Sequence, residues 1–278
     1  TVDVFGGGIY EEGINVDGFL KYQLDKTSHE ATVFGYEEGL PSNVVFPSSV
    51  TVGSETYVVT RIGDEAFKEC TELSSVEFPT TITSIGDDAF CKSGVASVTI
   101  PASVTHIGRS AFGACSNLAS ITIPDGVVSI GDAAFFGCNL ITSIEIPASV
   151  TEIGTEAFSA CSINSIIVDE NNTVFDSRNG CNAIIDKSGR LIQGCNTTVI
   201  PSDVNCIANS AFEGCTGLTS ITIPEGVEKI EGQAFDHCNN LSSVSIPNSV
   251  TSLGWAAFGS CAFASITIPK GVKEIPSM

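Results

Sequence analysis

Positively charged side chains are scarce in this chain: 12 Lys and Arg residues stand against 32 Asp and Glu residues, for a formal net charge of −20. The phosphate groups of nucleic acids and anionic lipids are bound mainly through Lys and Arg. The charge balance therefore argues against nucleic acid as a partner, and it suits a protein that works outside the cell.

Long apolar runs are also missing. The longest span only a few residues, whereas a transmembrane helix needs roughly 20, so the sequence predicts no membrane insertion. No secretory leader is visible either. Because the chain begins at Thr1 rather than Met, we expect a leader peptide to have been removed by processing or left out by design.

Groups of residues with catalytic or metal-binding spacing are lacking as well. His29, His106 and His237 lie far apart, and no Ser–His–Asp or Cys–His arrangement can be recovered around them. One group of acidic and amide side chains could either coordinate calcium or simply form turns; its spacing does not match an EF-hand. That group consists of Asp169, Glu170, Asn171, Asn172, Asp176 and Asn179. We predict no catalytic residue, no metal site and no cofactor.

An internal repeat dominates the sequence. The dipeptide Ala-Phe recurs eight times at intervals of 22 or 23 residues, with one gap of 54. Its phenylalanines are Phe67, Phe90, Phe112, Phe135, Phe158, Phe212, Phe235 and Phe258. Proline follows an apolar residue in the same phase, at Pro47, Pro79, Pro101, Pro124, Pro147, Pro201, Pro224, Pro247 and Pro269. So many steps in one phase indicate a repeat protein.

The unit at residues 118–138 shows what each position does. Ile121 and Ile123 alternate with polar residues, which predicts a short strand with its aliphatic side chains turned inward. Pro124 has no N–H and ends the strand. Val127 and Ile130 are expected to turn the chain back across the core. Gly131 would then allow a tight bend, and Asp132 would cap a short helical turn carrying Ala134, Phe135 and Cys138.

No single unit can bury its apolar side chains, but stacked units can. We therefore predict one solenoid domain over residues 1–278, a leucine-rich-repeat-like right-handed coil. A parallel β-sheet should form one face and short helical turns the other. Residues 44–278 should form about ten coils, and strands spaced by about 4.8 Å would make the sheet on the order of 45–50 Å long.

Four regions depart from the repeat. The coil at 47–79 is longer and should contain a small hairpin that includes residues 56–59. The coil at 169–201 is also longer and lacks Ala-Phe; a hairpin turning at residues 187–189 is expected there, together with a bend or bulge in the solenoid. Residues 1–43 read as an N-terminal β-hairpin cap. The last coil, from Pro269 to Met278, carries no comparable cap.

The units resemble the BspA-like (Treponema-type) leucine-rich repeat, L-x-x-I-x-I-P-x-x-V-x-x-I-G-x-x-A-F-x-x-C. The resemblance covers residues 44–275 and is clearest in the copies at 118–138, 141–161, 218–238 and 241–261. It implies a bacterial surface or secreted protein of a family associated with adhesion, without identifying a ligand. The long coil at 169–201 also resembles an insert found among Bacteroides-like members of the family.

Cysteine follows the repeat at most of its positions. A metal or redox array, or a column of small buried residues, would account for Cys70, Cys115, Cys138, Cys161, Cys215, Cys238 and Cys261. We favour the buried column, because zinc needs a local cluster of four ligands. Cys181 and Cys195 instead fall on opposite sides of the turn at Ser188. They would form a cross-strand disulfide in an oxidising compartment or remain two free thiols.

The outward side of the predicted sheet is lined by hydroxyl groups. The column four residues before proline reads Ser75, Ser97, Ser120, Ser143, Thr197, Ser220, Ser243 and Ser265, and the next outward column reads Glu77, Thr99, Thr122, Glu145, Val199, Thr222, Ser245 and Thr267. Such a face either makes broad contacts with glycans or proteins or is simply a soluble surface. Trp255 and Phe136 interrupt polar or small columns; each is either an exposed binding anchor or folded against a neighbouring coil.

These features favour a non-enzymatic, surface-exposed or secreted binding protein, adhesin-like, whose partners are host or microbial surface proteins or glycans. The alternative is a structural spacer or display scaffold within a larger surface protein. The uncapped C-terminal coil adds a further expectation, end-to-end self-association. An enzyme is disfavoured because no catalytic constellation is present.

Overall fold

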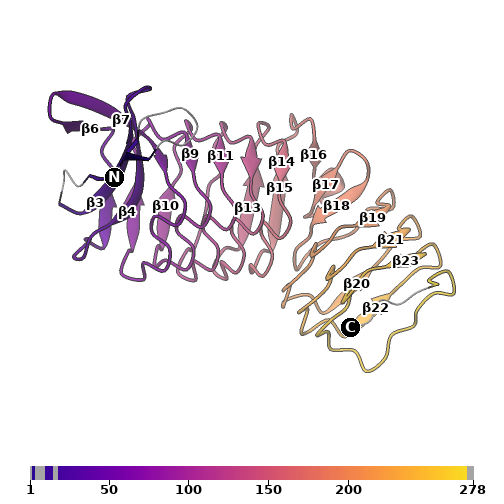
Figure 1. Cartoon of the computed structure of the whole chain (residues 1–278). Helices are drawn as coiled ribbons and strands as arrows, with labels where there is room; N and C mark the ends of the chain where they lie inside the picture. Colours follow the sequence, from indigo (N-terminus) through magenta and orange to yellow (C-terminus); the bar gives the residue numbers. More distant parts are fainter. Residues whose placement is uncertain (1, 4–9, 15–17, 274–278) are drawn as a thin grey trace.

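The computed structural model describes residues 2–3, 10–14 and 18–273, which form one stack of coils (Figure 1). The stack has about 8 turns rather than the ten expected. The long segment 169–201 accounts for part of the difference, because it completes no Ala-Phe turn of its own. On that side the flanking coils bond directly, with the N–H of Ala160 donating to the carbonyl of Glu213 at 2.9 Å.

Most Ile-Pro segments pair side by side, parallel and in register, as predicted, in three separate ladders. The strand expected at Ile121 and Ile123 is not formed, although both side chains are buried. Val76 lies opposite Val98, and Ile144 lies opposite Ile166. The strands on this side are β5 (Asn43–Val45), β8 (Ser75–Glu77), β10 (Ser97–Thr99), β13 (Ser143–Ile146), β15 (Ser165–Val168), β20 (Ser220–Thr222) and β22 (Ser243–Ser245). Their alternate residues are buried or, in β10 and β22, half-buried, because successive side chains of a strand point to opposite faces.

A second parallel face is formed by the Val-x-x-Ile segments, which we had expected only to return the chain across the core. Ile107 lies opposite both Ile85 and Ile130. The strands are β9 (Ser84–Ile85), β11 (His106–Ile107), β12 (Ser129–Ile130), β14 (Glu152–Ile153), β19 (Cys206–Ile207), β21 (Lys229–Ile230) and β23 (Ser252–Leu253). Stacking at the repeat distance aligns these short segments as well, so the prediction of a sheet on one face was incomplete.

The Ala-Phe side consists of hydrogen-bonded turns rather than helical ones. The residues two before and two after each phenylalanine have positive φ, as at Glu65 (57°) and Glu69 (59°) around Phe67. Left-handed residues interrupt a right-handed helix. Each turn therefore bonds to the next coil, with the N–H of Phe67 donating to the carbonyl of Ala89 at 2.7 Å.

Helix is almost absent from the described part of the chain, where the one helical segment is the 3-10 turn η1 (Arg178–Gly180). Within the same residues no helix is long and apolar enough to cross a membrane.

The Ala-Phe phenylalanines point into the core and stack on one another. From Phe67 to Phe158 successive ring centroids are 5.2–5.5 Å apart, with ring planes within 6°. A second stack runs from Phe212 to Phe258. Between the two stacks, Gly194 lies against the ring of Phe212; a Cβ added there would be 2.1 Å from that ring. The predicted inward orientation is thus confirmed.

The Gly-Asp step has a different role from the one expected. Gly131 has no positive φ; instead, a Cβ there would lie 2.6 Å from the backbone nitrogen of Arg109 in the preceding coil. Asp132 does not cap a helical turn of its own coil. Its Oδ1 accepts a hydrogen bond from the N–H of Thr155 in the following coil at 2.7 Å. Both residues therefore serve the close stacking of coils.

Antiparallel strands cover the first coil. They are β1 (Val2–Asp3), β2 (Tyr10–Ile14), β3 (Leu20–Asp25) and β4 (Glu30–Tyr36). The predicted β3–β4 hairpin is confirmed, and β4 continues the second face by pairing in parallel with β7 (Glu55–Ile62). The small hairpin expected in the first long coil is β6 (Ser49–Val52) with β7. Residues 1, 4–9 and 15–17 of the cap lie outside the described ranges.

The second long coil bends the solenoid, as predicted (Figure 1). Its hairpin is β17 (Ile184–Asp186) with β18 (Arg190–Gln193), and β16 (Phe175–Asp176) pairs with β17. These strands widen the second face ahead of β19. On the Ala-Phe side no turn is inserted, and the hydroxyl of Ser159 donates directly to the carbonyl of Ser210 at 3.1 Å. A wedge inserted on one side alone turns the axis toward the other. The buried core divides into two clusters here.

Candidate binding surfaces

The cysteine column lies in the core, except for Cys261, which is half-buried. Five of its seven thiols donate to the phenylalanine carbonyl of the preceding coil, as Cys138 does to Phe112 at 3.1 Å. Burial raises the pKa of Cys115 to about 11 and that of Cys161 to about 12. Thiols held in this way are poor nucleophiles and poor metal ligands, because both roles need the thiolate.

Cys181 and Cys195 are buried free thiols. Ile185 faces Leu191 as expected, but a register shift follows and brings Ile184 opposite Gln193. The thiol of Cys195 contacts the carbonyl of Asn182 at 3.3 Å, and Cys181 packs in the other hydrophobic cluster. The register shift thus brings Cys195 to Asn182, and in the structure both thiols are free, the second of the two alternatives.

The three histidines remain on separate coils. His29 stacks on Tyr57 with ring centroids 5.6 Å apart, and His106 Nδ1 contacts the hydroxyl of Thr105 at 2.6 Å. His237 Nδ1 lies 3.2 Å from a carboxylate oxygen of Asp236. Over the described ranges, no group of three or more His, Cys, Asp or Glu side chains is arranged to hold a metal ion.

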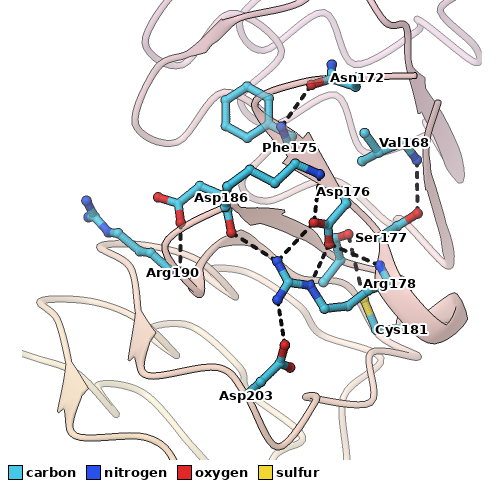
Figure 2. Close-up of polar contacts among 12 residues, drawn as sticks. Val168, Asn172, Phe175, Asp176, Ser177, Arg178, Cys181, Asp186, Arg190 and Asp203 are labelled. Carbon is cyan, nitrogen blue, oxygen red and sulfur yellow. Dashed lines mark hydrogen bonds and ion pairs between the residues drawn. The ribbon is translucent and has the colours of Figure 1, made fainter. Parts of the chain in front are cut away.

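The group considered for calcium forms turns instead (Figure 2). The Asn172 amide nitrogen donates to the carbonyl of Pro147 at 2.8 Å, and its oxygen accepts from the N–H of Phe175 at 2.8 Å. Oδ1 of Asp169 accepts from the N–H of Asn171 at 2.8 Å. These oxygens are already used by local backbone donors, as is typical of Asn and Asp in turns.

Arg178 ties the long coil to the one that follows it (Figure 2). Its guanidinium donates to Asp176 through Nε and Nη2, at 2.6 and 2.9 Å, and its Nη1 donates to Asp203 at 2.6 Å. Burial opposes ionisation of Asp176, but hydrogen bonds from Arg178 and Lys187 outweigh it and lower the pKa of that carboxyl. The cluster is a charge-assisted clamp at the bend.

The outward face of the Ile-Pro strands is exposed and mostly polar, as predicted. Three apolar side chains interrupt it: Val45, Ile167 and Val199 are 68%, 50% and 72% exposed. Of these, only Val199 belonged to the outward column read from the sequence, and it was not singled out there. Ile167 holds the same position, two residues before the proline of the repeat. Because Asp169 replaces that proline, the position of Ile167 in the repeat is not apparent from the sequence. Shallow grooves of about 310 and 280 Å³ lie beside Ile167 and Val199.

The two aromatic candidates differ in their surroundings. Trp255 is 52% exposed on the Ala-Phe side of its coil. Phe136 is half-buried and lines a pocket of about 290 Å³ at the bend. The other walls of this pocket come from three further coils and include Ala160, Cys161, Ser162, Glu213, Gly214, Thr216, His237 and Asn239. We refer to it below as the bend pocket; sequence analysis identified Phe136 but not the residues that surround it.

A groove of about 420 Å³ lies at the C-terminal end of the described stack. Its lining includes Phe258, Phe263 and Ile266, which are half-buried where their counterparts in earlier coils are covered by the next coil. Residues 274–278 of the last coil lie outside the described ranges.

Comparisons with known proteins agree with this architecture. The profile described as BspA type leucine rich repeat region matches residues 60–184 and 190–278 in six copies. A leucine rich cell surface protein from Faecalibacterium prausnitzii is 29% identical over 93% of this chain and 83% of its own, with a TM-score of 0.56. A leucine-rich repeat protein from Bacteroides ovatus is 26% identical over 93% of this chain and 59% of its own, with a TM-score of 0.55.

The pneumococcal vaccine antigen PcpA is similar in fold, with a TM-score of 0.71 over 100% of this chain and 84% of its own, at 20% identity. No curated protein sequence matches the chain.

Proposed function

This chain belongs to the BspA-type leucine-rich-repeat family, and on that premise we propose that it is a non-enzymatic binding protein, displayed at the bacterial surface or secreted, with an adhesin-like role. The cell-surface description of the Faecalibacterium relative supports the location. The net charge of −20 suits a protein that works outside the cell. Partners are proteins or glycans of host or microbial surfaces.

The observation that carries the proposal is the outward face of the Ile-Pro strands. Hydroxyl and carboxylate groups stand there in parallel register, as at Ser75 opposite Ser97 and Glu77 opposite Thr99. Ile167 and Val199 are exposed within this polar field beside shallow grooves. A polar surface with apolar anchors near its centre is the usual composition of a protein-binding site.

A binding screen against immobilised matrix proteins, mucins and a glycan array tests the proposal. We expect saturable binding, and we expect the double variant Ile167→Ser, Val199→Ser to weaken it at least tenfold. Val128→Ser is the matched control, because Val128 is an exposed valine on the other sheet face. Absence of saturable binding to every surface would favour the alternative, a structural spacer that holds another domain away from the cell.

A second copy of the chain is a further proposed partner, through the groove at the C-terminal end. Supporting it are the half-buried Phe258 and Phe263, which expose apolar area that a packed coil would cover. Sedimentation velocity over a hundredfold concentration range should show association, and Phe263→Asp should remove it. A monomer at all concentrations would eliminate this mode.

A further inference from the structure

The bend pocket lies where the bend brings two pairs of consecutive coils together. Gly137 donates its N–H to the carbonyl of Ser159 at 2.9 Å, and Gly214 donates to Asp236 at 2.9 Å. Together with the bond from Ala160 to Glu213 described above, these contacts place the turns bearing Phe136, Ser159, Glu213 and Asp236 in order along one side of the solenoid. Ser159 and Glu213 are 54 residues apart in sequence yet lie on adjacent turns.

The side chains that follow the core phenylalanines in these turns differ in size and charge. Phe136, Ser159, Glu213 and Asp236 all directly follow the core phenylalanine of their coil. Ser159 is small and fully buried, with its hydroxyl donating to the carbonyl of Ser210. The pocket is lined by the aromatic ring of Phe136 and by the Glu213 side chain, together with residues 160–162 of the turn that lies between theirs.

That carboxylate has an unused oxygen. Oε2 of Glu213 is buried and has no hydrogen-bond partner among the described residues, while the side chain also interacts with Ser210. A buried acceptor without a donor is unfavourable, so a ligand that supplies one gains affinity at this point. A cationic donor such as an ammonium group would form a charge-assisted hydrogen bond with this carboxylate.

The charge around the pocket is negative. Glu156 and Asp236 both act on Glu213 electrostatically, and His237 is held by Asp236. Burial raises the pKa of Glu213, a hydrogen bond from Ser210 opposes this, and the two neighbouring carboxylates raise it further. A cation entering the pocket would relieve this repulsion, and the face of the Phe136 ring would add a cation–π contact.

We propose that the bend pocket binds the ammonium group of a lysine side chain on a partner protein, with Glu213 as the counter-ion and Phe136 as the aromatic wall. Asn139, Thr216 and Asn239 line the rim and would contact the peptide that carries the lysine. This inference goes beyond the proposed function, since the pocket lies on the Ala-Phe side and not on the outward sheet face.

Titration with Nα-acetyl-lysine methylamide, followed by NMR or calorimetry, tests the inference. We expect a dissociation constant on the order of 1 mM for this isolated side chain, weakening severalfold when NaCl is raised from 50 to 500 mM. The Nε-acetylated form of the same probe has no charge and should bind at least tenfold more weakly. Equal affinity for both forms, or no binding of the charged probe at 20 mM, would overturn the inference.

Two variants assign the roles. Glu213→Gln keeps the shape of the side chain and should reduce affinity at least tenfold, while Glu225→Gln, an exposed acid outside the pocket, should not change it. Phe136→Leu keeps an apolar wall without a π face and should reduce affinity severalfold. Unchanged binding by Glu213→Gln, with thermal unfolding showing a folded protein, would also overturn the assignment.

The sheet-face variant separates this site from the proposed function. Ile167→Ser, Val199→Ser should bind the lysine probe as tightly as the parent chain does. If the surface screen fails while the probe still binds to the pocket, the adhesin-like proposal fails and the pocket assignment survives; the opposite result eliminates the pocket alone.

Discussion

Positive backbone angles recur around every core phenylalanine, but most of the residues that adopt them are not glycine. Ser110, Gln233 and Ala256, for example, have φ between 49° and 55°. A left-handed conformation costs a non-glycine residue roughly 1–2 kcal/mol. Hydrogen bonds to the next coil compensate for this cost, since each such residue lies in a turn whose N–H and C=O groups are used by its neighbours.

Gly137 and Gly214 hold equivalent positions in this pattern, both with φ of 71°, but their surroundings differ. A Cβ on Gly137 would lie an ordinary 3.7 Å from the Cα of Ala114, whereas one on Gly214 would lie 2.6 Å from the Cα of Ala160. Gly137→Ala should therefore cost about 1 kcal/mol, from backbone strain alone. Gly214→Ala should cost about 2 kcal/mol more, because the backbone of the adjoining coil must move.

Urea unfolding of the two alanine variants checks this difference. Similar losses of stability would contradict the closer approach of coils on the inner side of the bend.

Glu213 should limit stability at neutral pH. Its pKa is raised in the folded chain, mainly by burial, so the folded state favours the protonated form. The resulting contribution is fully present below the unfolded pKa, about 4.3, and is lost as pH rises through the folded value. Glu213→Gln should therefore stabilise the chain at pH 7.5, by a few tenths of a kcal/mol because the group is partly solvated. The gain should vanish near pH 4.

Chemical denaturation at both pH values measures this effect, with Glu225→Gln expected to change stability by less than about 0.5 kcal/mol at either pH. A Glu213→Gln protein that is less stable than the parent at pH 7.5 would show that the carboxylate has a stabilising partner. A gain in stability together with a loss of lysine binding would mark Glu213 as a residue kept for function.

Among the elements, the long coil is held by its charged clamp as well as by packing. Arg178 makes hydrogen bonds to Asp176, Asp203 and the carbonyl of Asp186. Arg178→Gln should destabilise this element by about 1–2 kcal/mol, the range expected for partly buried charge-assisted bonds. Amide exchange of residues 176–190 should accelerate roughly tenfold, since 1.4 kcal/mol corresponds to a factor of ten.

Exchange followed by mass spectrometry gives the local readout, and Arg61→Gln provides the control because Arg61 is exposed on β7. Protection of 176–190 equal to that in the parent chain would mean that the hairpin is held by its apolar residues alone.

Elements differed in how far the sequence could predict them. The Ile-Pro strands, the inward phenylalanines and the β17–β18 hairpin were predictable because each has a local pattern. The second sheet was not, since Ser129–Ile130 is too short to read as a strand and pairs only through stacking. The Ala-Phe turns were misread as helical because their left-handed residues, such as Glu65 and Gln233, are rarely glycine. The register shift in the β17–β18 hairpin also has no local signal.

At the scale of the whole molecule, the bend pocket was beyond sequence analysis for a related reason. Phe136 was recognisable as an unusual residue in its column, but its opposite wall, Glu213, lies on the far side of the inserted hairpin. Phe136 and Glu213 line the same pocket because the long coil widens the second sheet face but adds no turn on the Ala-Phe side. The sequence does not show this. The long coil therefore sets the direction of the solenoid axis. Through the direction of the axis it also sets the shape of the Ala-Phe surface on the inner side of the bend.

Replacing the long coil tests that relation directly. Residues 169–200 would be exchanged for a copy of residues 124–146, which supplies a regular unit with its own Ala-Phe turn. Because repeat proteins are stabilised by contacts between neighbouring coils, we expect this variant to fold, with the two phenylalanine stacks joined into one. The solenoid should straighten, and the new turn should separate Ser159 from Glu213 by about one further coil spacing of roughly 4.8 Å.

Small-angle scattering should then show a larger maximum dimension, and the lysine probe should lose affinity as it does in Glu213→Gln. A replacement that conserves the number of coils but keeps the hairpin, such as exchanging residues 224–246 for 124–146, is the control and should leave the bend unchanged. If the variant without the hairpin scatters like the parent chain, the hairpin does not cause the bend of the solenoid. The packing of the regular coils would then be its cause.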